Sequence, residues 1–200
     1  MRNLPLDLLR LSTLFLTSIL ASPGFAFDFP LTPNSIRDAY FLGTRQGSVS
    51  PDFRKQYSRG IDDLHQGNCI SKVRIETPFL QIAEAVGSRP NYSSQDAVKE
   101  FSGRPMKFRV FLDVCYTREA PPPNSINLKF IQNKKQVSPA TDVRSAFAER
   151  FSEESFLLPN GESAELEFDP KKLDSSTLTI LVDTPNGQHA EITFDLQSLR

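Results

Sequence analysis

Apolar and polar side chains alternate along several stretches of the chain, most clearly in MKFRVFLDVCYT. The even-numbered positions from 108 to 116 are apolar, whereas the odd-numbered positions include Lys107, Arg109 and Asp113. Successive side chains of a β-strand point to opposite faces of its sheet, so this pattern predicts a strand with one buried face. Similar alternation predicts strands around Val73 and Ile75; Ile126, Leu128 and Phe130; Ala164, Leu166 and Phe168; Leu178, Ile180 and Val182; and Ala190, Ile192, Phe194 and Leu196.

Turn-forming Pro, Asn and Gly separate these predicted strands. Many short strands joined by such turns are typical of an antiparallel β-sandwich. We therefore expect a mainly β protein, built as an antiparallel β-sandwich in the general style of immunoglobulin-like domains, with short N-terminal helices packed on it. That comparison concerns architecture and implies no function. The stretch EAPPPNS, residues 119–125, is expected to form an extended crossover, because proline cannot donate a hydrogen bond to a ladder.

Three short segments carry the start and stop signals of helices. Each begins at a serine, a favoured N-cap, and ends at a glycine: they run from Ser35 to Gly43, from Ser50 to Gly60, and from Ser93 or Ser94 to Gly103. In the first segment, Asp38 can complete a capping box with Ser35. Helices this short are marginal alone, so we expect each of them to pack against the larger sheet structure.

The segment TDVRSAFAERFSEESF, residues 141–156, fits two different structures. Val143, Phe147 and Phe151 recur every four residues, as on one side of a helix. Every second residue from Ser145 to Phe151 also fits one side of an irregular strand. Both interpretations stay open.

The N-terminus has the order of a secretory signal peptide over residues 1–26. Arg2 and Arg10 precede the apolar run LSTLFLTSIL, and the small residues Gly24 and Ala26 offer a cleavage site. We expect cleavage after Ala26 and an extracytoplasmic location, periplasmic or secreted. The apolar run is shorter than the roughly 20 residues that a spanning helix needs, so we expect no membrane span in the mature chain.

The remaining chain is expected to have two parts. Residues 27–66 carry the first two helix signals and should form an N-terminal helical segment. Residues 67–200 carry the alternating stretches and should form the β-sandwich domain, with the third helix as a short insertion near 94–102.

The chain contains two cysteines, Cys69 and Cys115. In an oxidising compartment such a pair forms a disulfide, and a bridge closing this loop would contribute on the order of 3 to 4 kcal/mol in the loop-entropy model. Two buried thiols are the alternative. Because Cys115 and Phe111 lie on the odd side of their strand, we expect the N-terminal helices to cover that side, tied there by the bridge.

Two stretches near the C-terminus echo each other: PNGESAELEFD, from position 159, and PNGQHAEITFD, from position 185. We interpret this similarity as two copies of the same turn-forming sequence, and not as a repeated functional motif. Pro, Asn and Gly suit a three-residue hairpin loop, in which a type I turn is followed by a left-handed residue. In the second copy this loop sets Val182 opposite Ala190, so that the apolar positions of both strands share one face.

The same loop in the first copy would set Phe156 opposite Ala164. Leu173 and Leu199 also correspond, which agrees with an old duplication of a hairpin. No third copy appears upstream, whereas stacked repeats generally need three or more.

Only two histidines are present, His65 and His189. The hairpin register places His189 opposite Asp183 on the outer face, which indicates an exposed structural pair. His65 lies beside Asp62 and Asp63 in IDDLHQGNC, where it could act as a base or simply end a helix.

The formal net charge is −1, and basic and acidic residues are interspersed, so no nucleic-acid partner and no anionic-membrane patch is expected. The chain has no tryptophan, which weakens the case for a sugar-binding platform. Glycine-rich phosphate loops, nucleophile elbows and paired metal-binding histidines are missing from the sequence. We therefore expect no catalytic residue, no cofactor and no metal site.

These observations favour a non-catalytic secreted or periplasmic module that binds another envelope or secreted protein or supports an assembly. The alternative is a small extracytoplasmic hydrolase with its site near His65. The segment AYFLG, residues 39–43, fits either a docking segment or a helix packed in the core. The sequence does not indicate the oligomeric state.

Overall fold

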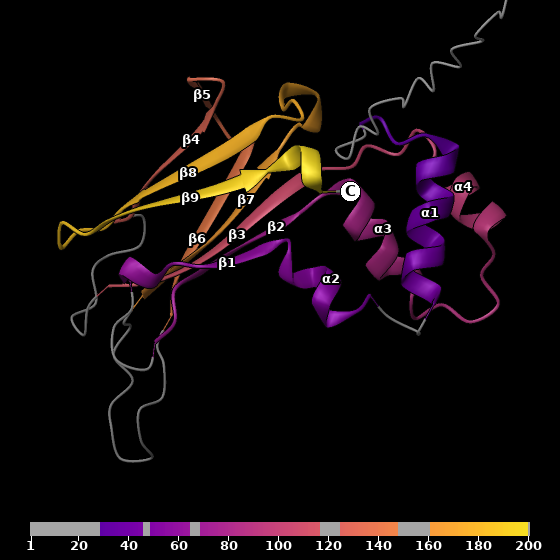
Figure 1. Ribbon diagram of the computed structural model, residues 1–200, viewed down its shortest axis with the longest axis horizontal. Helices are drawn as coiled ribbons and strands as arrows, with labels where there is room; N and C mark the ends of the chain where they lie inside the picture. Colours follow the sequence, from indigo (N-terminus) through magenta and orange to yellow (C-terminus); the bar gives the residue numbers. More distant parts are fainter. Residues whose placement is uncertain (1–28, 46–48, 65–68, 117–124, 148–160, 200) are drawn as a thin grey trace, which may run out of the picture.

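The protein is mainly β and contains two antiparallel sheets, with helices gathered toward one end (Figure 1). The computed structural model describes residues 29–45, 49–64, 69–116, 125–147 and 161–199. The expected signal peptide, His65 and all but the last residue of the proline-rich stretch lie outside these ranges.

Nine strands form the two sheets. The first sheet has the order β1 (Ser58–Gly60), β2 (Lys72–Glu76), β3 (Phe108–Cys115), β7 (Gly161–Phe168) and β6 (Thr141–Phe147). The second sheet has the order β5 (Lys135–Val137), β4 (Asn127–Gln132), β8 (Thr177–Asp183) and β9 (His189–Asp195). The strands that the alternation predicts are therefore confirmed.

The helical elements are short. The α-helices are α1 (Pro33–Thr44), α2 (Pro51–Lys55), α3 (Pro78–Val86) and α4 (Ser94–Phe101). Single turns of 3₁₀-helix are η1 (Asp62–Leu64), η2 (Pro170–Lys172) and η3 (Leu196–Ser198). Among the helices of the described residues, none combines the length and the apolar character that a bilayer crossing requires.

The inward faces of the two sheets contribute to one hydrophobic core. All even-numbered side chains of β3 are buried, as the alternation predicts. Phe130 of β4, in the second sheet, contacts Phe168 of β7, in the first, with ring centroids 4.9 Å apart. Phe168 also meets Phe108 edge to face at 6.2 Å. Aromatic contacts of this kind add to the stabilisation from burial, so they help to hold the two sheets together.

The hairpin of β8 and β9 has the predicted register. The facing pairs are Val182 with Ala190, Ile180 with Ile192, and Leu178 with Phe194. Gly187 has φ +81°, which confirms the left-handed position in the loop. The Asn186 side chain donates to the Tyr116 carbonyl oxygen at 2.7 Å. The loop therefore also anchors the chain directly after β3.

The predicted hairpin of the first copy is wrong. Ala164 pairs with Leu112 of β3 on one side and with Arg144 of β6 on the other. Both edges of β7 are occupied at this position, and Phe156 lies outside the described residues. The Pro-Asn-Gly sequence is the same in the two copies, but Gly161 belongs to strand β7 whereas Gly187 lies in the loop before β9.

The two copies do agree where their strands end. Asp169 and Asp195 each accept a hydrogen bond of 3.0 Å from the backbone N–H two residues later, and each caps a 3₁₀ turn. The corresponding leucines, Leu173 and Leu199, follow those turns and are buried. In each copy the Phe side chain therefore lies in the core, and the Asp side chain caps the 3₁₀ turn that follows the strand.

Residues 141–147 form strand β6, which pairs with β7 along its whole length. The strand interpretation is therefore correct for this half of the ambiguous segment. The remainder, residues 148–156, lies outside the described residues.

The expected helix boundaries need correction. α1 begins after Thr32, whose hydroxyl accepts from the Ser35 N–H at 3.1 Å, and Ser35 is inside the helix. α2 is capped by Ser50 as predicted but ends at Lys55, and Gly60 belongs to β1, so the segment expected to be helical also contributes a strand. α4 has the predicted Ser93 cap.

Gly43 does not end α1 but brings it close to α3. A Cβ atom at this position would lie 2.0 Å from the Ala83 carbonyl oxygen and 2.9 Å from a Val86 methyl carbon. The sequence interpretation missed α3, although Thr77 and Pro78 start it with the same hydroxyl-proline pair that starts α2.

The N-terminal helices do not cover the odd side of β3, contrary to expectation. Figure 1 shows α1, α3 and α4 grouped beyond one end of the strands. On the odd side the Arg74 guanidinium lies 4.4 Å from the centre of the Phe111 ring, and Arg109 pairs with Glu167 at 3.2 Å. Cation–π and ionic contacts between neighbouring strands occupy this face instead.

The disulfide between Cys69 and Cys115 is present, with the Cα atoms 6.0 Å apart. It joins the start of β2 to the end of β3. Because α3 follows the end of β2 and α4 precedes β3, the bridge and these helices lie at opposite ends of the strands. Buried Ser71 adds to this closure, since its hydroxyl accepts from the Cys115 N–H at 2.8 Å.

Gly187→Val should destabilise the protein by about 1 to 3 kcal/mol, because a β-branched residue is strained at positive φ. Gly187→Asn should lose much less, since Asn tolerates this conformation better. His189→Ala should also have a small effect, because its pair with Asp183 is exposed. Thermal melts of the three variants test this, and equal midpoints would contradict the register.

Gly43→Ala should destabilise the protein by about 1 to 3 kcal/mol or more, because the added methyl group meets the backbone of α3. Gly60→Ala is the matched control, since its Cβ would lie 3.4 Å from a movable Asp62 oxygen. Urea unfolding measures both changes. A Gly43 variant as stable as the control would show that α1 and α3 do not approach this closely.

Candidate functional site

A hollow of about 310 Å³ lies among α1, α2 and α3. Its lining is largely apolar and comprises Asp38, Phe41, Leu42, Arg45, Phe53 and Phe79. We call this the aromatic hollow. Its sides come from three helices whose starts are fixed by a hydroxyl cap followed by proline, at Thr32, Ser50 and Thr77.

The sequence of α1 explains why it presents two different faces. Asp38, Phe41, Leu42 and Arg45 follow the spacing i, i+3, i+4, i+7 and therefore share one side of the helix. Ile36, Ala39 and Gly43 lie on the other side and are buried. Within AYFLG, Ala39 and Gly43 are therefore core positions, whereas Phe41 is exposed, and the docking interpretation stays a prediction.

Phe41 is the most exposed of the apolar residues that line the aromatic hollow. Its side chain is 60% exposed, while Phe79 in the same hollow is only 6% exposed. Phe41 rests edge to face against Tyr40, with the ring centroids 5.3 Å apart. Exposing an aromatic side chain next to a hollow leaves apolar area in water that a partner could cover.

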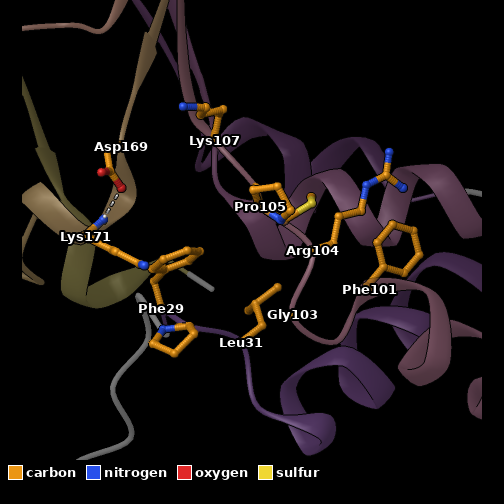
Figure 2. Close-up of a pocket in the computed structure, with 11 residues that line it drawn as sticks. Phe29, Leu31, Phe101, Gly103, Arg104, Pro105, Lys107, Asp169 and Lys171 are labelled. Atoms are coloured by element: carbon orange, nitrogen blue, oxygen red, sulfur yellow. Dashed lines mark hydrogen bonds between the residues drawn. The ribbon is translucent and has the colours of Figure 1, made fainter.

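Two further hollows flank the linker Ser102–Lys107, which joins α4 to β3. The first linker hollow has a volume of about 410 Å³ and is bounded by Phe29, Leu31, Lys107 and Lys171, among others (Figure 2). The second linker hollow is of similar volume and lies toward α3, with Arg89 and Arg109 in its lining. Five residues line both hollows: Phe101, Arg104, Pro105, Met106 and Lys107.

An ionic cluster holds the rim of the second linker hollow. Glu100 of α4 accepts from Arg89 at 2.6 Å and from the Tyr92 hydroxyl at 2.7 Å. Arg104 approaches the same carboxylate at 3.4 Å. These hydrogen bonds hold the pKa of the Glu100 carboxyl below its ordinary value, and the bond from Arg89 is the largest cause. Partial burial and the bond to Glu100 raise the pKa of Tyr92 to about 12.

A buried charged cluster lies on the inward side of β6 and β7. Arg144 donates two hydrogen bonds of 2.8 Å to the Asp142 carboxylate and approaches Glu162 at 3.4 Å. Glu162 also accepts from the Ser125 N–H at 3.0 Å. The contact with Asp142 is the first cause that raises the pKa of Arg144. Each charge of the cluster faces an opposite charge among the described residues, so we assign the cluster a structural role. The hydrogen bond from Ser125, just before β4, connects that strand to the first sheet.

The predicted pair of His189 and Asp183 is confirmed. The His189 Nδ1 atom lies 2.6 Å from Asp183 Oδ1 across the hairpin. This contact is the first cause that lowers the pKa of the Asp183 carboxyl. Both side chains are partly exposed, which agrees with a structural surface pair.

The site expected around His65 cannot be placed, because His65 lies outside the described residues. Its neighbours Asp62 and Asp63 form part of η1 and are exposed. Within the described ranges, no group of three or more His, Cys, Asp and Glu side chains is arranged to hold a metal ion.

Of the residues that line the three hollows, only Phe41 and Leu42 belong to a segment, AYFLG, that the sequence offered as a possible docking segment. Phe79 was missed together with α3, although the pair Thr77 and Pro78 signalled a helix start. Lys107 and Lys171 belong to segments far apart in the chain, and no local motif links them.

Comparison with known proteins identifies no relative, since no family model matches the chain and no curated protein or solved structure is significantly similar to it.

The Tyr92 phenol should ionise near pH 12 in the folded protein. Its folded pKa is raised above the unfolded value of about 10, so its contribution to stability is complete below pH 10 and is lost as the pH rises through 12. Ultraviolet titration of phenolate absorbance measures this. Tyr92→Phe should reduce the absorbance change that occurs near pH 12, and Glu100→Gln should lower the pKa of Tyr92. An unchanged titration curve in both variants would contradict the raised pKa of Tyr92.

Proposed function

We propose that the protein is a non-catalytic extracytoplasmic module that binds another envelope or secreted protein through the aromatic hollow. The observation that carries this proposal is the exposed Phe41 ring at the edge of a hollow formed with Leu42, Phe53 and Phe79. Aromatic side chains in pockets contribute much of the binding energy of protein interfaces.

The scaffold in this proposal is a β-sandwich in the general style of immunoglobulin-like domains. The shared core of the two antiparallel sheets and the contact between Phe130 and Phe168 support such an arrangement. The helices then form an addition at one end of the sandwich, where loops and short elements commonly carry the binding residues.

An extracytoplasmic location is part of the same proposal. The bridge between Cys69 and Cys115 supports it, because disulfides persist in oxidising compartments. The charge pattern of residues 1–26 supports it independently, through its likeness to a secretory signal peptide.

The charges around the aromatic hollow indicate the chemistry of the partner. Asp38 and Arg45 are two helical turns apart on the same side of α1, about 10 Å along the axis, with Phe41 and Leu42 between them. A complementary segment would insert an apolar or aromatic side chain and place a basic residue toward Asp38 and an acidic residue toward Arg45.

The alternative of a small hydrolase with its site near His65 stays a prediction, because that residue is outside the described ranges.

Photocrosslinking in the native producing cells tests the docking proposal. A photoreactive amino acid in place of Phe41 should give one discrete adduct, and the crosslinked peptide should carry an apolar or aromatic residue flanked by basic and acidic residues. Val143 is the matched control, since it is a similarly exposed apolar residue, at 59%, on the outer face of the first sheet.

Arg45→Glu in the Phe41 crosslinking variant should weaken the adduct, because it reverses one of the two flanking charges. No adduct from position 41, or equal adducts from positions 41 and 143, would overturn the proposal.

A further inference from the structure

The first linker hollow combines apolar walls with an excess of positive charge. It lies between the N-terminal segment at Phe29 and Leu31, the linker before β3, and η2 (Figure 2). In Figure 2, Lys107 bounds one side of the hollow, Asp169 and Lys171 a second, and Phe29 and Leu31 a third. Its volume of about 410 Å³ falls in the lower part of the range for small-molecule sites.

The apolar part of the lining is suited to a hydrocarbon group. Phe101 is 5% exposed, and Phe29, Leu31 and Met106 are half-buried. An apolar ligand body placed here would leave water on binding, which is favourable in proportion to the area covered.

The polar part of the lining carries three basic side chains and one carboxylate. Arg104 is already engaged, since it pairs with Glu100 at 3.4 Å and lies over the Phe101 ring at 5.6 Å. Lys107 and Lys171, in contrast, form no ion pair with any residue that the structure describes. Two ammonium groups at one hollow therefore have no ion-pair partner among the described residues.

The second linker hollow differs in this respect. Arg89 pairs with Glu100 at 2.6 Å and Arg109 with Glu167 at 3.2 Å, while its own carboxylate Glu84 pairs with Arg54 at 3.1 Å. Lys107 also lines this second hollow, where it is the one basic side chain without an ion pair among the described residues. Of the two hollows, the first is the one that adds a second such ammonium group, that of Lys171.

Asp169 limits the charge that such a ligand can carry. Its carboxylate accepts from the Lys171 N–H at 3.0 Å, so the first free N–H of η2 is already used and a negative charge sits at the hollow. A dianion such as a phosphate monoester would be repelled by this carboxylate. A singly charged anion is the better match.

We propose that the first linker hollow binds a small apolar carboxylate, with the carboxylate between the Lys107 and Lys171 ammonium groups and the apolar body against Phe29, Leu31 and Met106. The ligand chemistry is one negative charge on an apolar group of modest size. A free fatty carboxylate and the C-terminus of a short apolar peptide share this chemistry. This site is separate from the aromatic hollow, and its ligand is independent of the proposed protein partner.

Isothermal titration calorimetry of the mature chain tests the proposal, with sodium decanoate and an N-acetylated Leu-Leu-Phe tripeptide as the two probes. Their neutral counterparts, decanol and the tripeptide amide, are the matched controls. We expect at least one carboxylate probe to bind more tightly than its neutral counterpart, with an affinity that falls as salt is added. The probe that binds identifies the source of the carboxylate.

Lys107→Gln and Lys171→Gln should each lower the affinity about two- to fivefold, as loss of a partly exposed ion pair does. Lys134→Gln, at an exposed turn between β4 and β5, should leave it unchanged. Thermal melts check that all three variants are folded. Equal binding of charged and neutral probes, no binding of either carboxylate probe, or an unchanged affinity in both the Lys107→Gln and the Lys171→Gln variant would overturn the proposal.

Discussion

Burial of the even-numbered face of β3 is the interaction on which the rest of the structure depends. β3 lies in the middle of the first sheet, pairs with β2 and β7 along its length, and presents Phe108, Val110, Leu112 and Val114 to the core. Because side chains alternate strictly along a strand, a shift of one residue would turn this whole face to solvent. The disulfide at the end of β3 and the aromatic contacts at its start therefore secure a register that the core already requires.

The two ends of β3 have different roles. At its C-terminal end the chain is fastened by the Cys115 bridge, the Ser71 hydrogen bond and the Asn186 amide, which donates to Tyr116. At its N-terminal end it continues from the linker that separates two hollows, next to helices packed as closely as Gly43 allows. This division, with one end closed by a disulfide and the other end carrying hollows, would suit the proposed binding role, because a fixed scaffold keeps binding residues in place.

Charges are used in two ways in this protein. Inside, Arg144 and Glu162 satisfy each other and their neighbours, since an unpaired charge in the core would be costly. Outside, on the odd side of β3, Arg74 pairs with Glu76 of its own strand and lies over the Phe111 ring, and Arg109 pairs with Glu167 of β7. Lys107 and Lys171 follow neither pattern among the described residues, which is why we propose them as ligand-binding groups.

The sequence by itself determined the features that depend on local patterns. Strands β2, β3, β4, β7, β8 and β9 could be predicted because alternation acts over a few residues, whereas β1 and β5 were not predicted and β6 was left open between helix and strand. Turn chemistry and capping are equally local, so the left-handed Gly187 in the hairpin of β8 and β9 and the caps of α2 and α4 could also be predicted. The disulfide followed from there being only two cysteines.

Only the tertiary structure decided the features that depend on contacts between distant segments. It paired β7 with β3 and β6, although the turn residues before β7 are the same as those before β9. It made Gly43 a packing position, because the approach of α3 cannot be read from the sequence of α1. It also brought Lys107 and Lys171 to one hollow, since the position of η2 beside the linker depends on how the two sheets pack.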